Sequence, residues 1–254
     1  MTPELAAAFA RPVAHRGLHD RAQGRIENSP AAFAAAIDNG YAIECDIQLS
    51  ADGQPIVFHD YQLNRLTASS GYLRDFSEAQ LAQVQLLGSS DNIPSLADLL
   101  ALVNGQVPLV IELKPQPDGA TQIADAVVTV CRAYQGPLVL KSFDPGLVRR
   151  LRTLKAPYPL GIVSERHTQD EYPDLSVWQR WCRTWMLHGL KTGYDFISYD
   201  QGMLPHPAAT LARRLFRRPL MSWTVTSERR AAEIANEVDQ IVFEGYRPAV
   251  DASS

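Results

Sequence analysis

The sequence predicts an α/β protein of the (β/α)8 TIM-barrel type, with a small insertion after the second strand. Short apolar runs recur along the whole chain, each ending near a Gly, Pro, Asp or Lys and followed by a longer helical pattern. There are eight such runs, which is the number of strands that closes a parallel barrel. The length of 254 residues is close to the typical size of one such barrel.

The apolar runs give the strands, and the residues between them give the helices. In chain order the strand candidates are Pro12–Arg16, Ala42–Leu49, Leu109–Lys114, Leu138–Phe143, Leu160–Ser164, Phe196–Tyr199, Leu220–Val225 and Gln240–Phe243. Ser29 followed by Pro30 is an N-cap with proline at the first helical position, and Asn39-Gly40 ends that helix. Similar helix starts are seen at Ser95, at Asp144-Pro145, and at Ser227 before the run Arg229–Val238.

The stretch Ser50–Pro94 is too long for a simple connection between a strand and a helix. Its opening, Ala51-Asp52-Gly53-Gln54, is a turn signal that leads into another apolar run, Pro55–Phe58. We therefore expect a β-hairpin or strand extension across the barrel mouth. The remainder, about residues 61–94, is expected to be a small inserted segment within a single domain covering residues 1–254.

Composition excludes several classes of protein. A net charge of −4 disfavours wholesale binding of nucleic acid, which requires a strongly basic surface. No apolar run approaches 18 residues, and the N-terminus lacks the basic and apolar regions of a secretory signal. Cys45, Cys131 and Cys182 are an odd number and lie far apart, which favours reduced thiols. We expect a cytoplasmic protein without a transmembrane segment, and a homo-oligomer is compatible with the sequence.

Active sites of barrels collect at the carboxyl ends of the strands, so polar residues there are the first candidates. The first strand ends in His15-Arg16-Gly17, where the glycine allows a sharp turn. Along the second strand side chains alternate, so Glu44, Asp46 and Gln48 share one face and are expected to point into the barrel. Two buried anions repel each other and lose hydration unless a positive charge compensates.

The third strand adds a further inward carboxylate, Glu112, and an inward amine, Lys114. Three carboxylates without cysteine ligands suit Mg²⁺ or Ca²⁺ much better than zinc. The alternative is that Arg or Lys side chains neutralise Glu44, Asp46 and Glu112 in structural salt bridges, and the spacing alone leaves both interpretations open.

A second histidine, His59, ends the apolar run after the turn and is followed by Asp60, which either orients the histidine or caps a turn. Two histidines beside a metal and a lysine suit proton transfer at a phosphate ester. Lys141 ends the fourth strand and is a candidate phosphate contact, with a surface role as the alternative. Trp223 either packs in the core or walls off a substrate. Glu244 either faces the mouth or is a solvated strand end.

The remaining histidines are not assigned to the site. His167, His188 and His206 fall in helix or loop patterns and are expected at the surface, and His19 lies beyond the end of the first strand.

Taken together, these residues resemble the glycerophosphodiester phosphodiesterase family nearly from end to end. The matching motifs are His15-Arg16-Gly17, Glu27-Asn28-Ser29, Glu44-x-Asp46, Ser50-x-Asp52-Gly53, Val57-x-His59-Asp60, Leu63-x-Arg65-x-Thr67, Glu112-Leu113-Lys114, Ser142-Phe143 and Trp223-Thr224-Val225. The sequence departs from the family at Phe243-Glu244-Gly245-Tyr246, where the family more often places an Asp before a Pro. The match is densest in the first sixty residues.

The resemblance implies the same barrel fold and a role for each matched residue. Glu44, Asp46 and Glu112 would bind a divalent cation, Mg²⁺ or Ca²⁺, and His15 and His59 would be the acid–base pair. Arg16 and Lys114 would hold the phosphate, and Glu27 and Asn28 match a family loop near the site. In the family mechanism a glycerol hydroxyl attacks phosphorus and water then opens the cyclic phosphate.

The function that follows from the resemblance is hydrolysis of a glycerophosphodiester to sn-glycerol 3-phosphate and an alcohol. Two alternatives have different substrates or none: a lysophospholipase D-like phosphodiesterase acting on lysophospholipids, and a non-catalytic phosphate-binding barrel. An apolar acyl groove would distinguish the first. The presence of both histidines and all three carboxylates argues against the second, because binding alone needs no proton-transfer pair.

Overall fold

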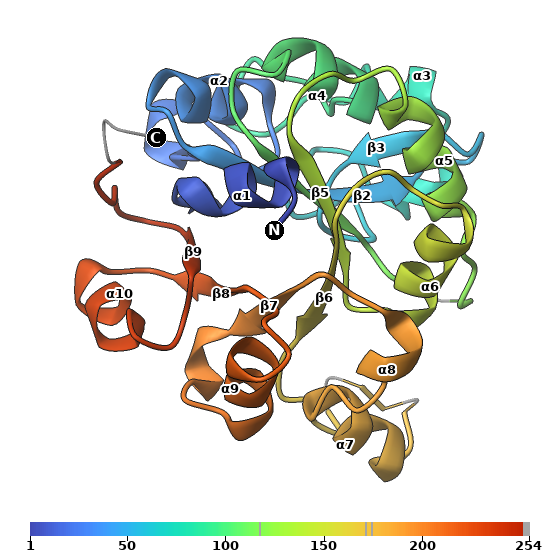
Figure 1. The fold of residues 1–254 in the computed structure, drawn as a ribbon. Coiled ribbons are helices and arrows are strands. Elements are labelled where there is room, and N and C mark those ends of the chain that lie inside the picture. The colour runs from blue at the N-terminus through green and yellow to red at the C-terminus, as the bar shows by residue number, and fades with distance from the viewer. Residues whose placement is uncertain (117, 171, 174, 251–254) are drawn as a thin grey trace.

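A ring of eight parallel strands forms the centre of the molecule in the computed structural model, which describes residues 1–116, 118–170, 172–173 and 175–250 (Figure 1). The parallel strands are β1 (Val13–Ala14), β2 (Ala42–Leu49), β4 (Leu109–Leu113), β5 (Leu138–Ser142), β6 (Leu160–Ser164), β7 (Phe196–Asp200), β8 (Leu220–Val225) and β9 (Gln240–Phe243). Pairing of β1 with both β2 and β9 closes the ring. This is the (β/α)8 barrel that the sequence predicts, and each predicted strand is present.

The first strand is shorter than the predicted Pro12–Arg16, because the chain turns directly after it. Arg16 and Gly17 both have positive φ, of 55° and 80°. A Cβ on Gly17 would lie 2.9 Å from the carbonyl carbon of Ala32, so only glycine fits this turn.

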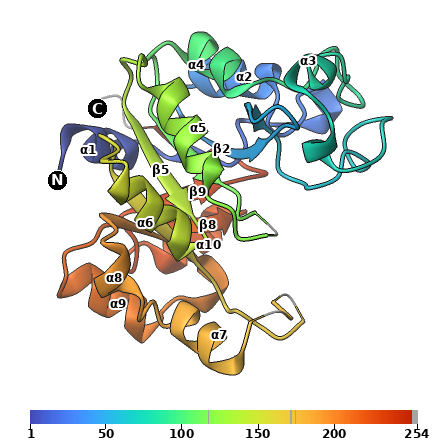
Figure 2. The ribbon, with the colours of Figure 1, turned by 90° about the vertical axis from the view of Figure 1, so that its right-hand side faces the viewer.

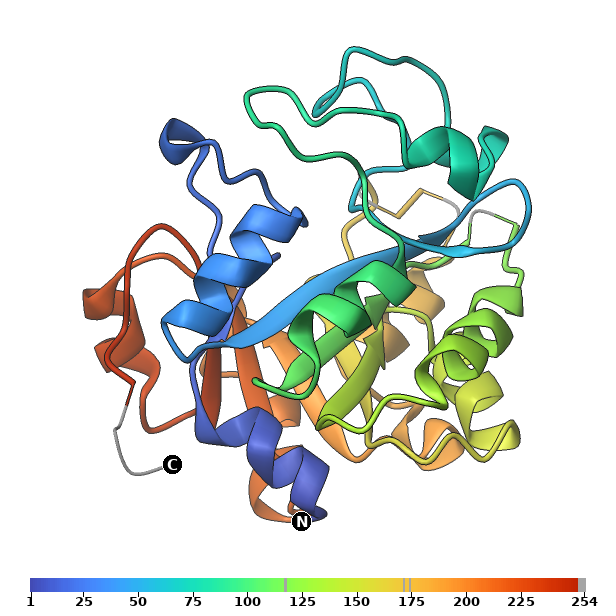
Figure 3. The ribbon, with the colours of Figure 1, turned by 90° about the horizontal axis from the view of Figure 1, so that it is seen from above.

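The predicted hairpin after β2 is also present. The short strand β3 (Pro55–Val57) pairs antiparallel with β2, with Ile47 opposite Val57. The segment 61–94 then runs outward beyond the barrel and contains the 3₁₀ helix η2 (Leu73–Asp75) and helix α3 (Glu78–Leu81), as Figure 3 shows. It has an apolar cluster of its own, made by Ile26, Ile56, Phe58, Leu63, Leu66, Leu73, Leu81, Leu86 and Ile93.

Helices surround the ring and lie between its strands (Figures 1 and 2). They are α2 (Pro30–Asp38), α4 (Leu96–Val103), α5 (Gln122–Cys131), α6 (Pro145–Thr153), α7 (Val177–Thr184), α8 (Gly189–Thr192), α9 (Pro207–Arg214) and α10 (Glu228–Ile234), with 3₁₀ turns η1 (Arg21–Gln23) and η3 (Gln201–Met203). The predicted caps Ser29, Ser95, Asp144 and Ser227 each accept a backbone hydrogen bond at a helix start. Among the described helices, none is long and apolar enough to cross a membrane.

The bottom of the barrel is filled by apolar side chains. This layer consists of Val13, Ala42, Val110, Val139, Phe196, Met221 and Val242, one residue from each of seven strands, and helix α1 (Pro3–Ala10) closes it with Leu5, Ala8 and Phe9. The ring of Phe196 occupies the place where a side chain on Gly161 would be, since a Cβ there would lie 2.3 Å from the ring. In the part of the chain that the structure describes, this layer and α1 therefore close the end of the barrel opposite the carboxyl ends of its strands.

Candidate active site

The polar side chains of the barrel mouth lie two residues beyond this apolar layer. Because side chains alternate along a strand, the residue two positions after an inward apolar residue also points inward, one step nearer the carboxyl end. His15, Glu44, Glu112, Lys141, Ser198, Trp223 and Glu244 all stand in this relation to the layer. The outward residues Ile43, Cys45 and Ile47 of β2 pack against the helices, as the alternation predicts.

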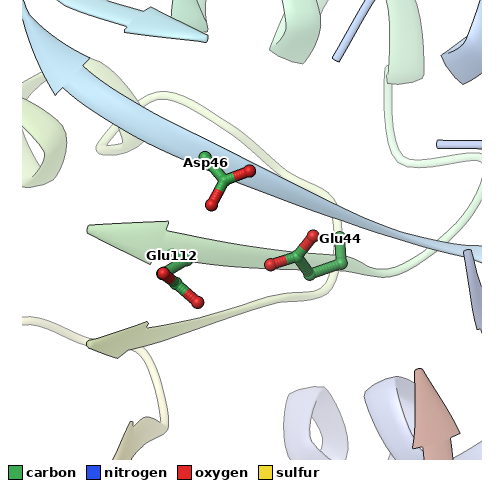
Figure 4. Close-up of side chains that lie close together, drawn as sticks. All are labelled: Glu44, Asp46 and Glu112. Atoms are coloured by element: carbon green, nitrogen blue, oxygen red, sulfur yellow. The ribbon is translucent and has the colours of Figure 1, made fainter. Parts of the chain in front are cut away.

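Three buried carboxylates converge at the centre of the site. Glu44, Asp46 and Glu112 are 1%, 2% and 4% exposed, and one oxygen of each lies within 4.8 Å of the other two (Figure 4). Asp46 of β2 stands directly opposite Glu112 of β4 in the strand register. Three converging carboxylate oxygens are a donor set that fits a hard divalent cation such as Mg²⁺ or Ca²⁺.

Positive side chains also contact these carboxylates, so the salt bridges that the sequence left open as one interpretation are present. Lys141 Nζ lies 3.0 Å from Glu44 Oε1 and 3.1 Å from Glu112 Oε2. Lys114 Nζ lies 3.2 Å from Glu112 Oε1 and 3.5 Å from Asp46 Oδ1, and Arg16 Nε lies 3.3 Å from Asp46 Oδ2. The contacts pair each carboxylate with at least one cation.

The pairing keeps this cluster ionised in spite of its burial. Burial would lower the pKa of Lys141, but Glu44 and Glu112 raise it above its ordinary value. Burial would likewise raise the pKa of Asp46, but Lys114 and then the charges of neighbouring basic groups hold it well below its usual range. Lys141 is only 2% exposed and stands opposite Glu112 in the strand register, so it lies beside the carboxylates and not at the protein surface.

The two histidines are each oriented by a carboxylate. His15 Nδ1 lies 2.7 Å from Glu244 Oε2, and His59 Nδ1 lies 2.7 Å from Asp60 Oδ1. The hydrogen bond with His15 and the neighbouring His19, whose Nε2 lies 3.7 Å away, hold the pKa of Glu244 below its usual range, so its carboxylate is ionised and can only accept a hydrogen bond. In both pairs the Nδ1–H donates to the carboxylate, which leaves Nε2 to exchange a proton.

A chain of ion pairs connects Arg16 to the second histidine. Arg16 Nη1 donates to Glu27 Oε1 at 2.6 Å, and Arg65 donates to Glu27 at 2.7 and 2.8 Å. Arg65 also donates to Asp60 at 2.6 and 2.9 Å, and Asp60 holds His59. Burial would raise the pKa of Asp60, but the hydrogen bonds from His59 and Arg65 lower it. Glu27 and Arg65 therefore set the position of Asp60, the carboxylate that pairs with His59.

Two amides position the site from the side. Asn28 Nδ2 donates to Asp46 Oδ2 at 3.0 Å, which orients the carboxylate. Gln48 Nε2 donates to the carbonyls of Phe58, His59 and Asp60 at 3.0, 3.0 and 2.6 Å. The third inward residue of β2 therefore fixes the backbone of the loop that carries His59.

These residues line one cavity of about 940 Å³ at the barrel mouth. His15, Arg16, His59, Lys114 and Trp223 all line it, together with the three carboxylates and Lys141. The nine residues that the sequence assigns to catalysis, metal binding or substrate binding thus all line this cavity. One wall is aromatic, since the rings of Phe143 and Trp223 meet edge to face with centroids 5.4 Å apart.

The expectation that the other histidines lie at the surface is wrong for His167, which is only 6% exposed. Its backbone N–H donates to Thr184 Oγ1 at 3.1 Å, because the loop after β6 folds under helix α7. His188 and His206 are half-buried. Burial lowers the pKa of His188 to about 4.

The alternatives left open for Glu244 are resolved by its contact with the first strand. Glu244 faces the mouth, where it contacts His15, although it was equally readable as a strand end in solvent. Cys45 and Cys131 are buried and Cys182 is half-buried, and all three are free thiols, as expected.

Comparisons with known proteins identify the family of this chain. The model of the glycerophosphoryl diester phosphodiesterase family matches residues 15–241. YhdW of Bacillus subtilis (strain 168), provisionally named a glycerophosphodiester phosphodiesterase, is 31% identical over 243 residues, which is 91% of this chain and 92% of the relative.

Solved structures show the same fold. A protein from Silicibacter pomeroyi DSS-3, provisionally named a glycerophosphoryl diester phosphodiesterase, superposes with a TM-score of 0.77 at 21% identity, over 94% of this chain and 93% of the other. An Oleispira antarctica phosphodiesterase in complex with the product sn-glycerol-3-phosphate superposes with a TM-score of 0.75 at 21% identity, over 93% and 94%. With the match to the family model over most of its length, this chain belongs to the glycerophosphoryl diester phosphodiesterase family of enzymes.

Proposed function

We propose that the protein hydrolyses glycerophosphodiesters to sn-glycerol 3-phosphate and an alcohol, with a divalent cation and two histidines. The observation that carries the proposal is the meeting of two carboxylate-oriented histidines, His15 and His59, with a buried carboxylate cluster in one cavity. A binding protein would need the charges but not two imidazoles with free Nε2 atoms. The Oleispira antarctica phosphodiesterase, which shares the fold, binds sn-glycerol-3-phosphate.

Glu44, Asp46 and Glu112 would hold the cation, Mg²⁺ or Ca²⁺. Bound there, a divalent cation supplies positive charge that offsets the charge developing on the phosphoryl oxygens. Lys114 contacts two of these carboxylates, at Glu112 and Asp46, and its ammonium would exchange part of this pairing for the substrate phosphate. Its pKa, raised by Glu112 and Asp46 against the effect of burial, keeps it charged for that role.

Arg16, Lys114 and Trp223 would bind the substrate directly, and Lys141 would act through its pairing with the carboxylates. Arg16 and Lys114 line the cavity and are partly exposed to it, with 17% and 12% of their side chains accessible. Lys141 is fully paired with Glu44 and Glu112, which suits a fixed charge that balances the cluster better than a mobile phosphate ligand. Trp223 lines the cavity with its ring packed edge to face on Phe143, so it would form an apolar wall against the substrate.

The histidines would move the two protons of the reaction. One Nε2 takes the proton from the attacking hydroxyl while the other gives a proton to the leaving alcohol oxygen as the P–O bond breaks. Glu244 and Asp60 would stabilise the positive charge that either imidazole gains in the transition state.

Release of sn-glycerol 3-phosphate from a panel of headgroups tests the proposal. The panel contains glycerophosphocholine, glycerophosphoethanolamine and glycerophosphoglycerol, each assayed with added Mg²⁺ or Ca²⁺ and with chelator. We expect release from at least one compound, and loss of that release with chelator. Absence of product from every compound with either metal would contradict the proposed reaction, and chelator-resistant turnover would contradict the metal requirement.

A second candidate substrate class, lysophospholipids, is favoured by the apolar part of the cavity wall. Phe143, Trp223, Pro173 and Leu175 line the cavity and offer an apolar surface for an acyl chain. Adding lysophosphatidylcholine to the same panel, with formation of lysophosphatidic acid as the readout, distinguishes the two substrate classes. A higher kcat/KM for the lysophospholipid than for glycerophosphocholine would favour the second class.

A further inference from the structure

Helix α7 turns its apolar side away from the protein. Trp178, Trp181 and Trp185 follow one another at spacings of three and four residues, so they lie on the same face of the helix. They are 66%, 44% and 36% exposed, and within α7, which is described throughout, no residue is buried. An ordinary surface helix packs its apolar stripe on the core, so the orientation of α7 is the reverse of the usual one.

The polar side of α7 is what attaches it to the barrel. Arg183 lines the catalytic cavity, and its carbonyl accepts a hydrogen bond from Ser164 Oγ at 3.1 Å. Thr184 Oγ1 accepts the backbone N–H of His167 at 3.1 Å. Rotation of the helix to bury its tryptophans would break these contacts, so the outward orientation of the tryptophans is fixed by the fold.

The apolar surface continues from α7 across to α9. Leu187, Leu211, Leu215 and Phe216 are 51%, 51%, 66% and 56% exposed. Trp185 joins the two parts, because it lines a hollow of about 390 Å³ together with Leu187, Leu211 and Phe216. We name this surface the Trp–Phe face; its members are Trp178, Trp181, Trp185, Leu187, Leu211, Leu215 and Phe216. Figures 1 and 2 show α7 at the outer edge of the molecule, with α8 and α9 beside it.

The tryptophans form a continuous aromatic row within this face. The rings of Trp178 and Trp181 stack with centroids 5.1 Å apart, and those of Trp181 and Trp185 lie 6.0 Å apart. Trp185 in turn lies 4.9 Å from the ring of His206, which holds it against the body of the protein. Tryptophan rings have an apolar body and a polar N–H, which suits the boundary between water and lipid.

Basic residues border the same face. Residues 213–218 read Arg-Arg-Leu-Phe-Arg-Arg, four arginines around the apolar pair, in a chain whose net charge is −4. Arg214 and Arg217 are exposed. Arginines beside exposed aromatic and aliphatic side chains complement an anionic lipid surface. A twofold contact between two copies would instead bring two such arginine clusters toward each other, and their like charges would oppose it.

We propose that the Trp–Phe face docks on an anionic lipid surface. The tryptophans would enter the headgroup region, and Arg214 and Arg217 would contact lipid phosphates. Because Arg183 of α7 and Leu175 just before it line the catalytic cavity, docking would hold the cavity mouth close to the lipid surface. The proposal concerns binding and does not depend on the phosphodiester reaction.

Vesicle flotation of the whole protein tests it. The wild type should bind vesicles of mixed phosphatidylcholine and phosphatidylglycerol more tightly than vesicles of phosphatidylcholine alone, and less tightly at high salt. Trp178→Ser with Trp181→Ser should weaken binding about tenfold or more, and Arg214→Glu with Arg217→Glu should weaken it about tenfold for the anionic vesicles. Leu87→Ser with Leu102→Ser, which removes residues 42% and 37% exposed outside the face, is the matched control and should bind like wild type.

Two further readouts keep the result unambiguous. Three of the four tryptophans of the chain belong to the face, so brominated lipids should quench most of the wild-type fluorescence. If the tryptophan variant does not fold by circular dichroism, Leu215→Ser with Phe216→Ser takes its place. Absence of binding to anionic vesicles at low ionic strength would overturn the proposal, as would equal binding by the face variants and the control. Concentration-dependent dimerisation of the wild type that is lost in the tryptophan variant, without vesicle binding, would also overturn it and assign the face to a second copy.

Discussion

The imidazole of His15 and the carboxylate of Glu244 lie 2.7 Å apart, although 229 residues separate them in the chain. The contact joins the ends of the first and last strands of the barrel, which are neighbours because β1 pairs with β9. The hydrogen bond with His15 and the neighbouring His19 keep Glu244 ionised, with its pKa below the ordinary value. The arrangement fixes the ring of His15 with Nε2 directed away from the carboxylate.

Glu244→Gln should therefore lower kcat while changing KM little. The amide lacks the negative charge that stabilises the imidazolium, and it does not fix the tautomer of His15. We therefore expect kcat to fall roughly tenfold to hundredfold, which is less than the loss expected when the proton-transfer group itself is removed. Steady-state kinetics with glycerophosphocholine measure it. Glu228→Gln, at an exposed position on α10, is the control and should leave both constants unchanged. Equal kinetics for the two variants would reduce Glu244 to a structural residue.

The same carboxylate gives a pH-dependent contribution to stability. Its folded pKa is below the ordinary value of 4.5, so its stabilising effect is present above about pH 4.5 and is lost as the pH falls through the folded value. The difference in melting temperature between wild type and Glu244→Gln should be largest near neutral pH and shrink as the pH is lowered below 4.5. Thermal unfolding in a series of buffers measures this. A difference that grows on acidification would mean that the pKa of Glu244 is raised, not lowered.

His15→Ala and His59→Ala should each lower turnover by roughly two to four orders of magnitude, because each removes one of the two proposed proton-transfer groups. Both variants should keep the circular dichroism spectrum of the wild type. His206→Ala is the matched control, since His206 is a half-buried histidine that does not line the cavity. Near-normal turnover in a folded His15 or His59 variant would remove that residue from the mechanism.

Lys114 and Lys141 should respond differently to replacement by Met. Lys114→Met removes a charge that faces the substrate, so kcat/KM should fall, while affinity for the divalent cation should rise because the competing ammonium is gone. Lys141→Met leaves Glu44 and Glu112 without their buried partner and should cost about 3–5 kcal/mol of stability. Lys155, which is exposed, is the control for loss of a lysine charge.

Kinetics, calorimetric titration with Mg²⁺ and thermal unfolding together separate these effects. A Lys114→Met variant with normal kinetics would assign that lysine a structural role. A Lys141→Met variant as stable as Lys155→Met would show that the cluster tolerates an unpaired carboxylate.

Alternation along the strands was sufficient to predict most of the site. It placed Glu44, Asp46 and Gln48 on one face and Glu112 with Lys114 on another, and the helix caps and the hairpin were readable from local signals. Glu244 obeys the same rule, since it follows the inward residue Val242 by two positions. Its role was left open because the contact that decides it comes from the opposite end of the chain.

Long-range partners account for the rest of what sequence could not give. The pairing of Arg65 with Glu27 and Asp60 depends on how the segment 61–94 folds back on the first loop. The burial of His167 depends on where α7 lies. Likewise, the sequence spacing of the carboxylates is the same for a metal site and for salt bridges. The positions of Lys114 and Lys141 in the structure show that lysine ammonium groups reach these carboxylates.

The positive side chains around Asp46 change the effect on stability that we expect from metal binding. Asp46 is paired with Lys114 and Arg16, so Asp46→Asn should lower the melting temperature of the metal-free protein, because it leaves those two cations with less negative charge. In wild type, Mg²⁺ or Ca²⁺ at about 100 times its dissociation constant should stabilise the fold by roughly 2.7 kcal/mol, a rise of several degrees. Asp46→Asn should show a much smaller rise over the same titration.

Monovalent salt at matched ionic strength separates coordination from screening. It should not reproduce the wild-type shift, because screening acts on exposed charges and Glu44, Asp46 and Glu112 are at most 4% exposed. Asp52→Asn, which changes a carboxylate in the exposed turn before β3, is the control and should keep the full metal response. If Asp46→Asn and Asp52→Asn respond to the divalent cation alike, the cation binds elsewhere, and the three buried carboxylates serve only their salt bridges to Arg16, Lys114 and Lys141.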